Sequence, residues 1–282
     1  MQVVHTGADW NKYWLESIKN DKSIGFVPTM GALHEGHMDL VRKAKAESEI
    51  VVVSIFVNPT QFNSLEDFNN YPSTIDEDLD KLKNEHVDFV FIPNADSIYI
   101  EKPKLSINFG DIETVLEGAF RPGHFNGVGI VVSKLFNIIK PHKAFFGQKD
   151  LQQTGIIRRL VKDLSMDVQL VIVPTRREED GLAMSSRNVR LSPEEREHAL
   201  ILINSLAKAK QELLASKPWF EVQNQIKCDF EEMPSASLEY FELIHPESFA
   251  SYPDFDASQK SSICVAAYLG KIRLIDNLPI IP

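Results

Sequence analysis

Two histidines stand three residues apart in the stretch VPTMGALHEGHMDL, which runs from residue 27 to residue 40. His34 and His37 follow an apolar, strand-like run and a short loop that contains Gly31. A zinc site is one interpretation, but on a helix Glu35 would point roughly 100° away from His34, so it is a poor further ligand. A pair of ordinary core or surface histidines is another interpretation. The position of the pair in the chain favours a third interpretation, phosphate binding.

The order strand, glycine-containing loop, helix favours phosphate binding. In this arrangement backbone N–H groups and the positive end of a helix dipole lie at the carboxyl edge of a parallel sheet. Imidazoles at that edge can donate hydrogen bonds to phosphoryl oxygens, and these bonds strengthen as the transition state gains charge. The stretch is not the GxGxxG fingerprint, and no acidic residue stands where that fingerprint requires one, which argues against a nicotinamide dehydrogenase. We therefore predict that His34 and His37 bind phosphate.

The stretch FFGQKD, residues 145–150, also follows a strand-like run and precedes a helical pattern. Lys149 at such a corner can pair with a phosphate, and Asp150 can accept from a ribose hydroxyl or cap the helix. Gln153 lies four residues after Lys149, hence on the same helical face if the helix begins that early. Taken alone, Lys149 also fits an ordinary solvent-exposed lysine.

Two more polar stretches have the same setting. GLAMSSRN, residues 181–188, offers two hydroxyls and the planar guanidinium of Arg187 to a polyphosphate. VNPTQFN follows a strand-like run and carries Asn58 and Gln61, uncharged groups suited to recognising hydroxyls or an amide. Either stretch alone also fits a plain turn. All four stretches follow strands, and ligands of open α/β sheets bind beyond the carboxyl ends of parallel strands, so we expect one ligand site.

Apolar runs alternate with amphipathic ones up to about residue 175, which predicts an α/β domain with a parallel sheet and crossover helices. We expect strands at residues 24–30, 50–57, 87–93, 142–147 and 167–174, and helices at 37–48, 76–86, 129–140 and 151–164.

The pattern changes after residue 190. We expect one long helix over 193–215, with Ser192 as its N-cap and Pro193 in its first position. A second helix over 219–232 and strands at 238–244, 261–269 and 272–280 complete a smaller α+β domain. The predicted domains are 1–175 and 176–282.

Composition limits the function. The 282 residues are 43% hydrophobic, typical of a folded protein, and carry 30 Lys and Arg against 40 Asp and Glu, a net charge of −10. This charge argues against a nucleic-acid surface. Cys228 and Cys264 form no CxxC pair, and we expect reduced thiols. With neither a leader-like start nor a run of about 20 apolar residues, we expect a cytoplasmic protein without a membrane span.

At this point the motifs resemble those of the pantoate-β-alanine ligase family. The resemblance rests on PTMGALHEGH, FVNPTQF, RPGHFNGV at residues 121–128, FFGQKD with Gln153, and DGLAMSSRN. It runs in order from Gly25 to Leu191 and continues weakly to RLIDN near the end. It implies a Rossmann-like nucleotidyltransferase domain, with LHEGH as a HIGH-type signature and MSSRN as the counterpart of the KMSKS loop, and a smaller α+β C-terminal lid domain.

The resemblance also implies the reaction. Pantoate would attack the α-phosphorus of ATP to give pantoyl adenylate and pyrophosphate, and β-alanine would then displace AMP to give pantothenate. Mg²⁺ would enter with ATP, without direct ligation by the protein, and Asp78 would assist through a water molecule. The expected partners are these small molecules and a second copy of the chain, as a homodimer formed by the N-terminal domains.

The family's site residues carry over onto the matching positions. The expected catalytic groups are His37, His34, Lys149, Ser185 and Arg187, with His37 as proton donor. Pantoate would be held by Gln61 and Gln153, with Asn58 close by and Gln61 also bordering β-alanine. The residues expected to bind ATP are Met30, Gly31, Ala32, Leu33, His34, Glu35, Gly36, His37, Gly147, Gln148, Lys149, Asp150, Arg176, Met184, Ser185, Ser186 and Arg187.

Two positions depart from the family pattern: Ser73 stands where an arginine is common, and Arg176 stands where a small apolar residue is common. We expect Ser73 to weaken a dimer contact or a loop contact. At Arg176 we expect nucleotide contact through the backbone, so that the side chain alters the packing of the adenine pocket without abolishing the contact. Two rival functions stay open at this point. One is a nucleotidyltransferase that activates another acid, and the other is a regulatory protein that binds nucleotide without chemistry.

Overall fold

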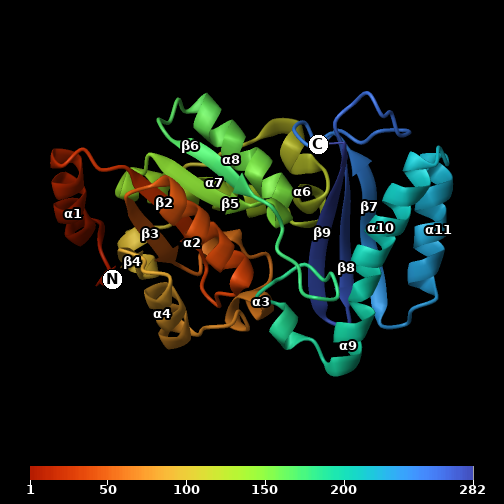
Figure 1. Cartoon of the computed structure of the whole chain (residues 1–282), viewed down its shortest axis with the longest axis horizontal. Helices are drawn as coiled ribbons and strands as arrows, with labels where there is room; N and C mark the ends of the chain where they lie inside the picture. The colour runs from red at the N-terminus through yellow and green to blue at the C-terminus, as the bar shows by residue number, and fades with distance from the viewer. Residues whose placement is uncertain (282) are drawn as a thin grey trace. The chain divides into compact units, whose positions relative to one another are not determined.

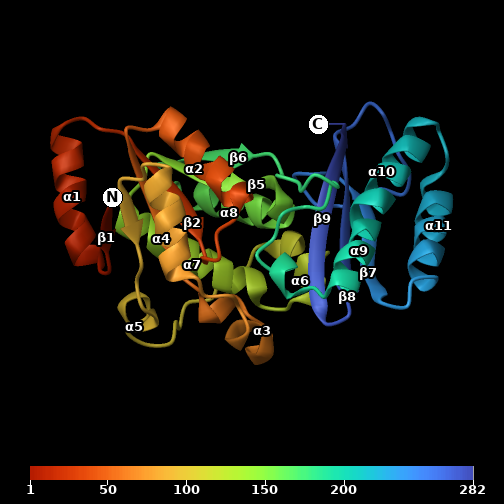
Figure 2. The same ribbon diagram turned by 60° about the horizontal axis from the view of Figure 1, so that its bottom comes forward.

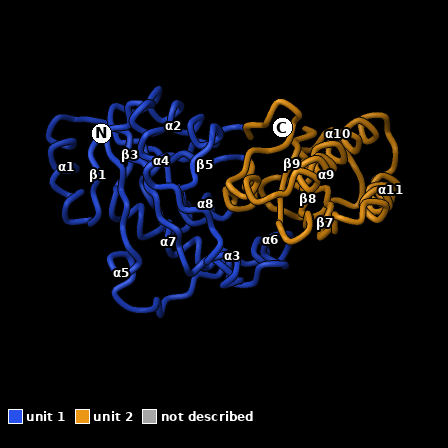
Figure 3. Tube along the Cα trace, turned by 90° about the horizontal axis from the view of Figure 1, so that it is seen from below, with its two compact units in different colours: residues 1–148, 156–174 blue, residues 149–155, 175–282 orange. Residues whose placement is uncertain are grey.

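The computed structural model describes residues 1–281, and these residues form two compact units (Figure 3). Unit 1 contains residues 1–148 and 156–174, and unit 2 contains residues 149–155 and the chain from 175 onward. The chain therefore passes between the units near residue 175, and a short segment around Lys149 groups with unit 2. The domains 1–175 and 176–282 stay a prediction.

Unit 1 is built on a six-stranded sheet in which every pairing is parallel, as predicted (Figure 1). The strand order is β1-β4-β3-β2-β5-β6, so the chain order reverses between β2 and β5. Such a reversal is the point at which doubly wound sheets bind ligands. The strands are β1 (Gln2–Val4), β2 (Ile24–Thr29), β3 (Ile50–Ile55), β4 (Phe89–Phe91), β5 (Lys143–Gly147) and β6 (Gln169–Val173).

Helices cover both faces of this sheet (Figure 2). Val52 packs into the core on the side of α1 and α7, whereas Val51 and Val53 pack on the side of α2 and α4. Because successive strand side chains point to opposite faces, a strand covered on both sides is apolar throughout, which explains the run IVVVSI. The long helices are α1 (Gly7–Lys19), α2 (Glu35–Glu47), α4 (Ile75–Asn84), α7 (His124–Ile139) and α8 (Leu151–Asp163).

Both units also contain short helical segments. They are η1 (Pro59–Gln61), α3 (Leu65–Asn69), α5 (Ala95–Ile98), η2 (Gly110–Thr114), α6 (Glu117–Phe120), η3 (Gln148–Asp150) and η4 (Asn188–Arg190). No helix within residues 1–281 has both the length and the apolar composition that a membrane span requires.

Unit 2 has an antiparallel sheet in the order β7-β8-β9, which confirms the α+β prediction. Its strands are β7 (Ala236–Ile244), β8 (Ser261–Leu269) and β9 (Ile272–Ile281), and its longer helices are α10 (Leu200–Leu214) and α11 (Trp219–Glu231). Trp219 stacks on Phe241 with ring centroids 5.6 Å apart, so α11 is anchored on the sheet.

The single helix expected over 193–215 is wrong, because the structure has α9 (Pro193–His198) followed by α10. Its predicted start is confirmed: Ser192 and Glu195 form a reciprocal capping box. The break falls at Ala199, whose carbonyl accepts from Leu202 N–H at 3.2 Å, an i to i+3 bond that tightens the helix locally. The sequence has neither Gly nor Pro at this point to signal the break.

Candidate active site

The loop after β2 places both motif histidines at the start of α2. His34 is the N-cap residue, and its Nδ1 accepts from Gly36 N–H at 3.2 Å. Nδ1 of His37 accepts from the N–H of His34, also at 3.2 Å, and the two ring centroids are 4.0 Å apart. The two side chains thus cap the helix reciprocally, as a Ser and Glu pair does elsewhere.

This capping fixes the tautomer of both rings. A backbone N–H can only donate, so the Nδ1 atom that faces it must be the unprotonated nitrogen of a neutral imidazole. The proton of each ring therefore lies on Nε2. His34 and His37 carry N–H donors at the positive end of the α2 dipole, which is the arrangement that binds an anion.

Helix α4 holds the loop in place. The carboxylate of Asp78 is fully buried and accepts from the N–H groups of Ala32, at 2.8 Å, and Leu33, at 2.7 Å. One turn further on, Lys81 Nζ donates to the carbonyl of Leu33 at 2.6 Å. Asp78 was expected to act through a water molecule, whereas here it binds the loop backbone directly and positions the start of α2.

The turn after β3 brings Gln61 next to the same loop. Gln61 Nε2 lies 3.0 Å from Sδ of Met30, and its Oε1 accepts from Nδ2 of Asn58 at 3.1 Å. The backbone carbonyl of Gln61 lies 2.7 Å from Nδ1 of His124. The structure therefore brings together three of the motifs: PTMGALHEGH, FVNPTQF and RPGHFNGV.

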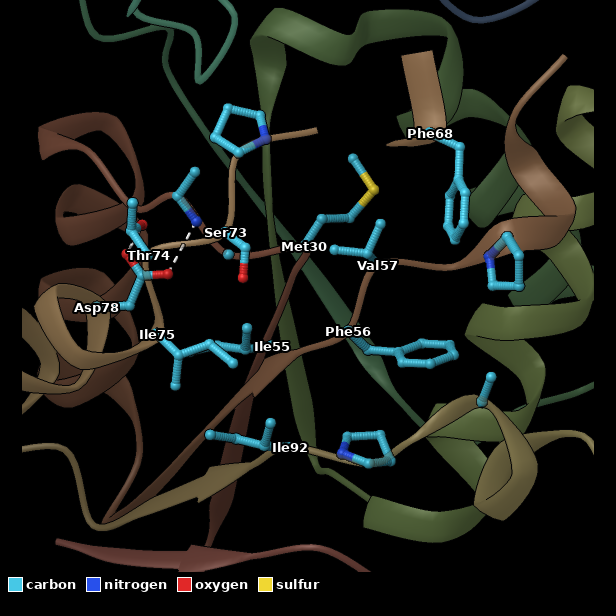
Figure 4. A pocket seen from close by; sticks show the side chains of 16 residues that line it. Met30, Ile55, Phe56, Val57, Phe68, Ser73, Thr74, Ile75, Asp78 and Ile92 are labelled. Atoms are coloured by element: carbon cyan, nitrogen blue, oxygen red, sulfur yellow. Dashed lines mark hydrogen bonds between the residues drawn. The ribbon is translucent and has the colours of Figure 1, made fainter. Parts of the chain in front are cut away.

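A pocket of about 230 Å³ opens at the carboxyl ends of β2, β3 and β4 (Figure 4). Its walls are mostly apolar, and one of its lining residues, Met30, also contacts Gln61. Ser73, the position at which an arginine was expected, lies on its wall. The lining residues include Ile55, Phe56, Val57, Phe68, Ile75 and Ile92.

Gly147 is the last residue of β5, the neighbour of β2 across the chain reversal, and Gln148 follows it. The parallel register of Phe26 with Ala144 brings the ends of the two strands to the same edge of the sheet. Both residues are half-buried. In unit 1 the structure thus places Gly147 of FFGQKD at the same edge of the sheet as the loop that leads to His34.

Lys149 and Asp150 belong to unit 2, where Lys149 Nζ lies 3.3 Å from Oδ1 of Asp150. The carbonyl of Lys149 accepts from Nδ2 of Asn277 at 2.8 Å. Asn277 is the last residue of RLIDN, and its contact with Lys149 was not anticipated from the sequence. Gln153 is half-buried on the first turn of α8.

The residues of MSSRN follow a small hairpin in unit 2. Arg177 and Ala183 form its β-bridge, and Met184 N–H donates to the carbonyl of Arg176 at 3.0 Å. Because this contact uses the backbone of Arg176, its side chain, which is exposed, does not disturb the hairpin. Ser185 Oγ accepts from the N–H of Arg187 at 3.2 Å, and the four residues 184–187 are half-buried.

The predicted site residues are thus divided between the two units. Those in unit 1 are Met30, Gly31, Ala32, Leu33, His34, Glu35, Gly36, His37, Asn58, Gln61, Gly147 and Gln148. Those in unit 2 are Lys149, Asp150, Gln153, Arg176, Met184, Ser185, Ser186 and Arg187. Glu35 is the outlier of the first group, because its exposed carboxylate pairs with Arg42 at 2.9 Å.

A parallel sheet with helices on both faces and imidazole donors at its chain reversal defines an α/β protein with a site suited to a phosphate-bearing ligand. More narrowly, the chain belongs to the pantoate-β-alanine ligase family, whose model matches residues 2–279. The activity of this family is the ATP-dependent joining of pantoate and β-alanine to give pantothenate, AMP and pyrophosphate, and the chain is an enzyme of this kind.

Individual members of the family are similar to this chain over nearly its full length. The chain is 45% identical over 279 residues to the pantothenate synthetase of Thermosipho africanus, and 46% identical over 280 residues to that of Fervidobacterium nodosum, with 99% of each chain covered. The crystal structure of pantothenate synthetase from Thermus thermophilus matches with a TM-score of 0.92 at 39% identity, covering 100% of both chains.

A second solved structure shows ligands. Pantoate-β-alanine ligase from Francisella tularensis, complexed with β,γ-ATP and β-alanine, matches with a TM-score of 0.79 at 36% identity. The match covers 99% of this chain and 98% of that one.

Proposed function

We propose that this chain makes pantothenate in two steps through a pantoyl adenylate, with the His34 and His37 pair as the phosphate clamp. A carboxylate oxygen of pantoate attacks the α-phosphorus of ATP, the bond to the bridging oxygen breaks, and pyrophosphate leaves. The amine of β-alanine then attacks the acyl carbon, the bond to the adenylate oxygen breaks, the nitrogen loses a proton, and AMP leaves. The Francisella structure with ATP and β-alanine supports this choice of substrates.

The observation that carries the proposal is the fixed tautomer of the two histidines. With Nδ1 of each ring bonded to a backbone N–H, both rings keep their proton on Nε2. Two such donors at a helix N-terminus bind phosphoryl oxygens, and they bind more strongly as negative charge develops during adenylation. We assign His37 as the group whose Nε2–H donates a hydrogen bond to the oxygens of the leaving pyrophosphate; the proton stays on the ring, which is neutral and has no other.

Residues of the other loops take the remaining roles. Gln61 and Gln153 bind pantoate, Asn58 supports Gln61, and Gln61 also borders β-alanine. Gly147 to Asp150 surround the nucleotide, with Lys149 neutralising phosphate charge. Met184 to Arg187 bind the triphosphate, where Arg187 can pair with two oxygens at once.

Mg²⁺ enters with ATP in this proposal. Among residues 1–281 there is no group of three His, Cys, Asp or Glu side chains suited to hold a metal ion, and the carboxylate of Asp78 is occupied by backbone amides. Magnesium favours substrate phosphates and water molecules over a cage of protein ligands. When bound it would neutralise charge on the phosphates.

The test is pyrophosphate release from ATP with pantoate, followed by AMP and pantothenate when β-alanine is added. His34→Ala and His37→Ala should each slow pyrophosphate release by roughly 10² to 10³, the scale for a lost transition-state donor. His34→Asn separates capping from catalysis, because asparagine keeps the N-cap acceptor while losing Nε2–H. It should fold like the wild type and still be slow.

His86→Asn is the matched control, since His86 is exposed, has a φ of 54° that asparagine tolerates, and lies outside the site. Full activity in His34→Ala or His37→Ala would show that this histidine does not bind phosphate in the transition state. ATP binding without pyrophosphate release would indicate a regulatory protein, and release with a different acid would indicate a different substrate.

We also propose that the protein works as a cytoplasmic homodimer and supplies pantothenate for coenzyme A. The family resemblance of the motifs supports this. Sedimentation equilibrium at micromolar concentration should give twice the chain mass of 31.9 kDa, and a monomer mass would contradict the dimer.

A further inference from the structure

The side chain of Asn58 is the starting point, because its two ends are fixed by backbone groups. Asn58 is 1% exposed. Its Oδ1 accepts from the N–H of Thr60 at 3.3 Å, and its Nδ2 donates to the carbonyl of Gly127 at 3.4 Å. A backbone N–H can only donate and a carbonyl can only accept, so the amide of Asn58 has one possible orientation.

This orientation determines that of Gln61. Nδ2 of Asn58 donates to the side chain of Gln61 at 3.1 Å, so the Gln61 atom that faces it is the acceptor, Oε1. The other end of the amide is then the donor Nε2, which lies 3.0 Å from Sδ of Met30. A thioether is a weak acceptor. A carboxylate or hydroxyl oxygen of a substrate would be a stronger partner for the same N–H.

Tyr99 is the strongest partner of Asn58 by distance. It follows α5 at the end of the β4 loop, and its hydroxyl donates to Oδ1 of Asn58 at 2.8 Å. Its ring packs near Phe56, with centroids 6.4 Å apart, and Nζ of Lys134 lies 5.5 Å from the ring centroid. Burial raises the pKa of the Tyr99 phenol above its usual value of 10.0, against a smaller effect of Thr60. The hydroxyl therefore remains a donor over the working range of pH.

We propose that Tyr99 is a positioning residue for pantoate: through Asn58 it holds the Gln61 amide with its N–H end directed at the substrate oxygens. The inference rests on the proposed function in that it takes pantoate as the ligand of Gln61. Without the Tyr99 hydroxyl, Asn58 loses its shortest bond and keeps the longer ones, from Thr60 Oγ1 at 3.0 Å and Thr60 N–H at 3.3 Å and to the carbonyl of Gly127 at 3.4 Å. The Asn58 amide is then held less tightly, and Gln61 turns more freely. A turned Gln61 presents Oε1, which repels a carboxylate.

The first experiment is Tyr99→Phe, which removes one hydroxyl and keeps the ring. The KM for pantoate in pyrophosphate release should rise roughly 3- to 10-fold, the range for one buried hydrogen bond, while the KM for ATP and kcat stay near wild type. Partial unfolding would instead lower the apparent kcat and leave both KM values unchanged, because it only reduces the amount of active enzyme. Tyr252→Phe is the matched control, because its hydroxyl bonds the carbonyl of Lys260 in unit 2.

The second experiment asks whether Tyr99 acts through Gln61. In a Gln61→Ala background, Tyr99→Phe should cause no further rise in the KM for pantoate. An unchanged pantoate KM in the single variant, or an equal rise in both backgrounds, would overturn the inference.

A measurement without substrate keeps the test independent of the reaction. The side-chain NH₂ signals of Gln61 in a ¹H–¹⁵N spectrum are identified by their loss in Gln61→Ala. They should shift or broaden in Tyr99→Phe and stay in place in Tyr252→Phe. If the wild type fails to release pyrophosphate with pantoate, the proposed function fails, and this spectrum alone decides the inference: unmoved Gln61 signals would overturn it.

Discussion

Two loops that carry site residues are each held by one buried carboxylate, but the partners differ. In unit 1, Asp78 is 0% exposed and accepts from the backbone N–H groups of Ala32 and Leu33. In unit 2, Asp276 is 3% exposed and forms a two-bond pair with the guanidinium of Arg177, at 2.6 and 3.0 Å. One loop is bound through neutral amides and the other through a full opposite charge.

The difference shows which part of each loop is fixed. Asp78 bonds the residues that lead directly into the His34 cap, so its carboxylate positions the phosphate-binding backbone itself. Arg177 instead lies at the base of its hairpin, where it also donates to the carbonyl of Gly181 at 3.1 Å. The ion pair therefore fixes the base of the hairpin, and Met184 to Arg187 follow beyond it.

The largest expected effect comes from breaking the ion pair. Asp276→Ala leaves the half-buried Arg177 charge without its carboxylate, and the free energy of unfolding should fall by about 3 kcal/mol in urea titrations. Adding Arg177→Met should recover part of the loss, because the uncompensated charge is removed. Glu231→Ala, at an exposed carboxylate at the end of α11 in the same unit, is the control. A loss below about 1 kcal/mol would show that the pair contributes little.

Asp78→Asn should have a smaller effect on stability and a more direct one on activity. Asparagine can accept from one loop amide but turns an N–H group towards the other, at a cost of about 2 kcal/mol. Pyrophosphate release should also slow about tenfold, since the loop that presents His34 is displaced. Asp80→Asn, at an exposed position of the same helix, should change stability by less than about 0.5 kcal/mol. Wild-type kinetics in Asp78→Asn would show that the bonds from Asp78 to the loop backbone do not contribute to catalysis.

Glu242 sharpens the comparison, because it is a half-buried carboxylate with a weaker partner, Gln223 Nε2 at 3.4 Å. Burial raises the pKa of Glu242 above its ordinary value of 4.5, with Lys227 and Gln223 acting in the opposite direction. The folded state then holds this proton more tightly than the unfolded state, so its contribution to stability falls as pH rises through 4.5 and above.

Glu242→Gln should therefore raise the melting temperature at pH 7. The difference from wild type should shrink as the pH falls through the raised pKa towards 4.5, because below 4.5 the glutamate is mostly neutral in both states. Thermal unfolding followed by circular dichroism from pH 4 to 8 measures it. A variant that is less stable than the wild type at pH 7 would show that the charged Glu242 side chain stabilises the folded state.

Much of the fold followed from local patterns. The continuous apolar run of β3 and the helical spacing of α2 and α4 predicted a parallel sheet covered on both faces, and the structure confirms it. Two local features were missed. The elements β1 and α1, before residue 23, were not predicted, and the break at Ala199 has no sequence signal, because alanine is the best helix former.

The sequence by itself determined which residue types stand after each strand: the histidine pair, the Asn58 and Gln61 turn, Lys149 and the MSSRN loop. It did so because strand ends and helix starts are marked by local spacing, which depends on neighbours in the chain. Their roles as site residues rest on the family resemblance, and stay proposals until the variants are measured.

The tertiary structure decided how those residues are held. Asp78 meets Ala32 across 46 residues of chain, Tyr99 meets Asn58 across 41, and Asn277 meets Lys149 across 128. Such bonds leave no periodic trace in the sequence, since they depend on strand order and register. The direction of the Gln61 amide depends on Asn58, which in turn bonds the carbonyl of Gly127 across 69 residues of chain. The tautomer of the histidines follows from local bonds at the start of α2, but those bonds also form only once the helix and its cap are folded.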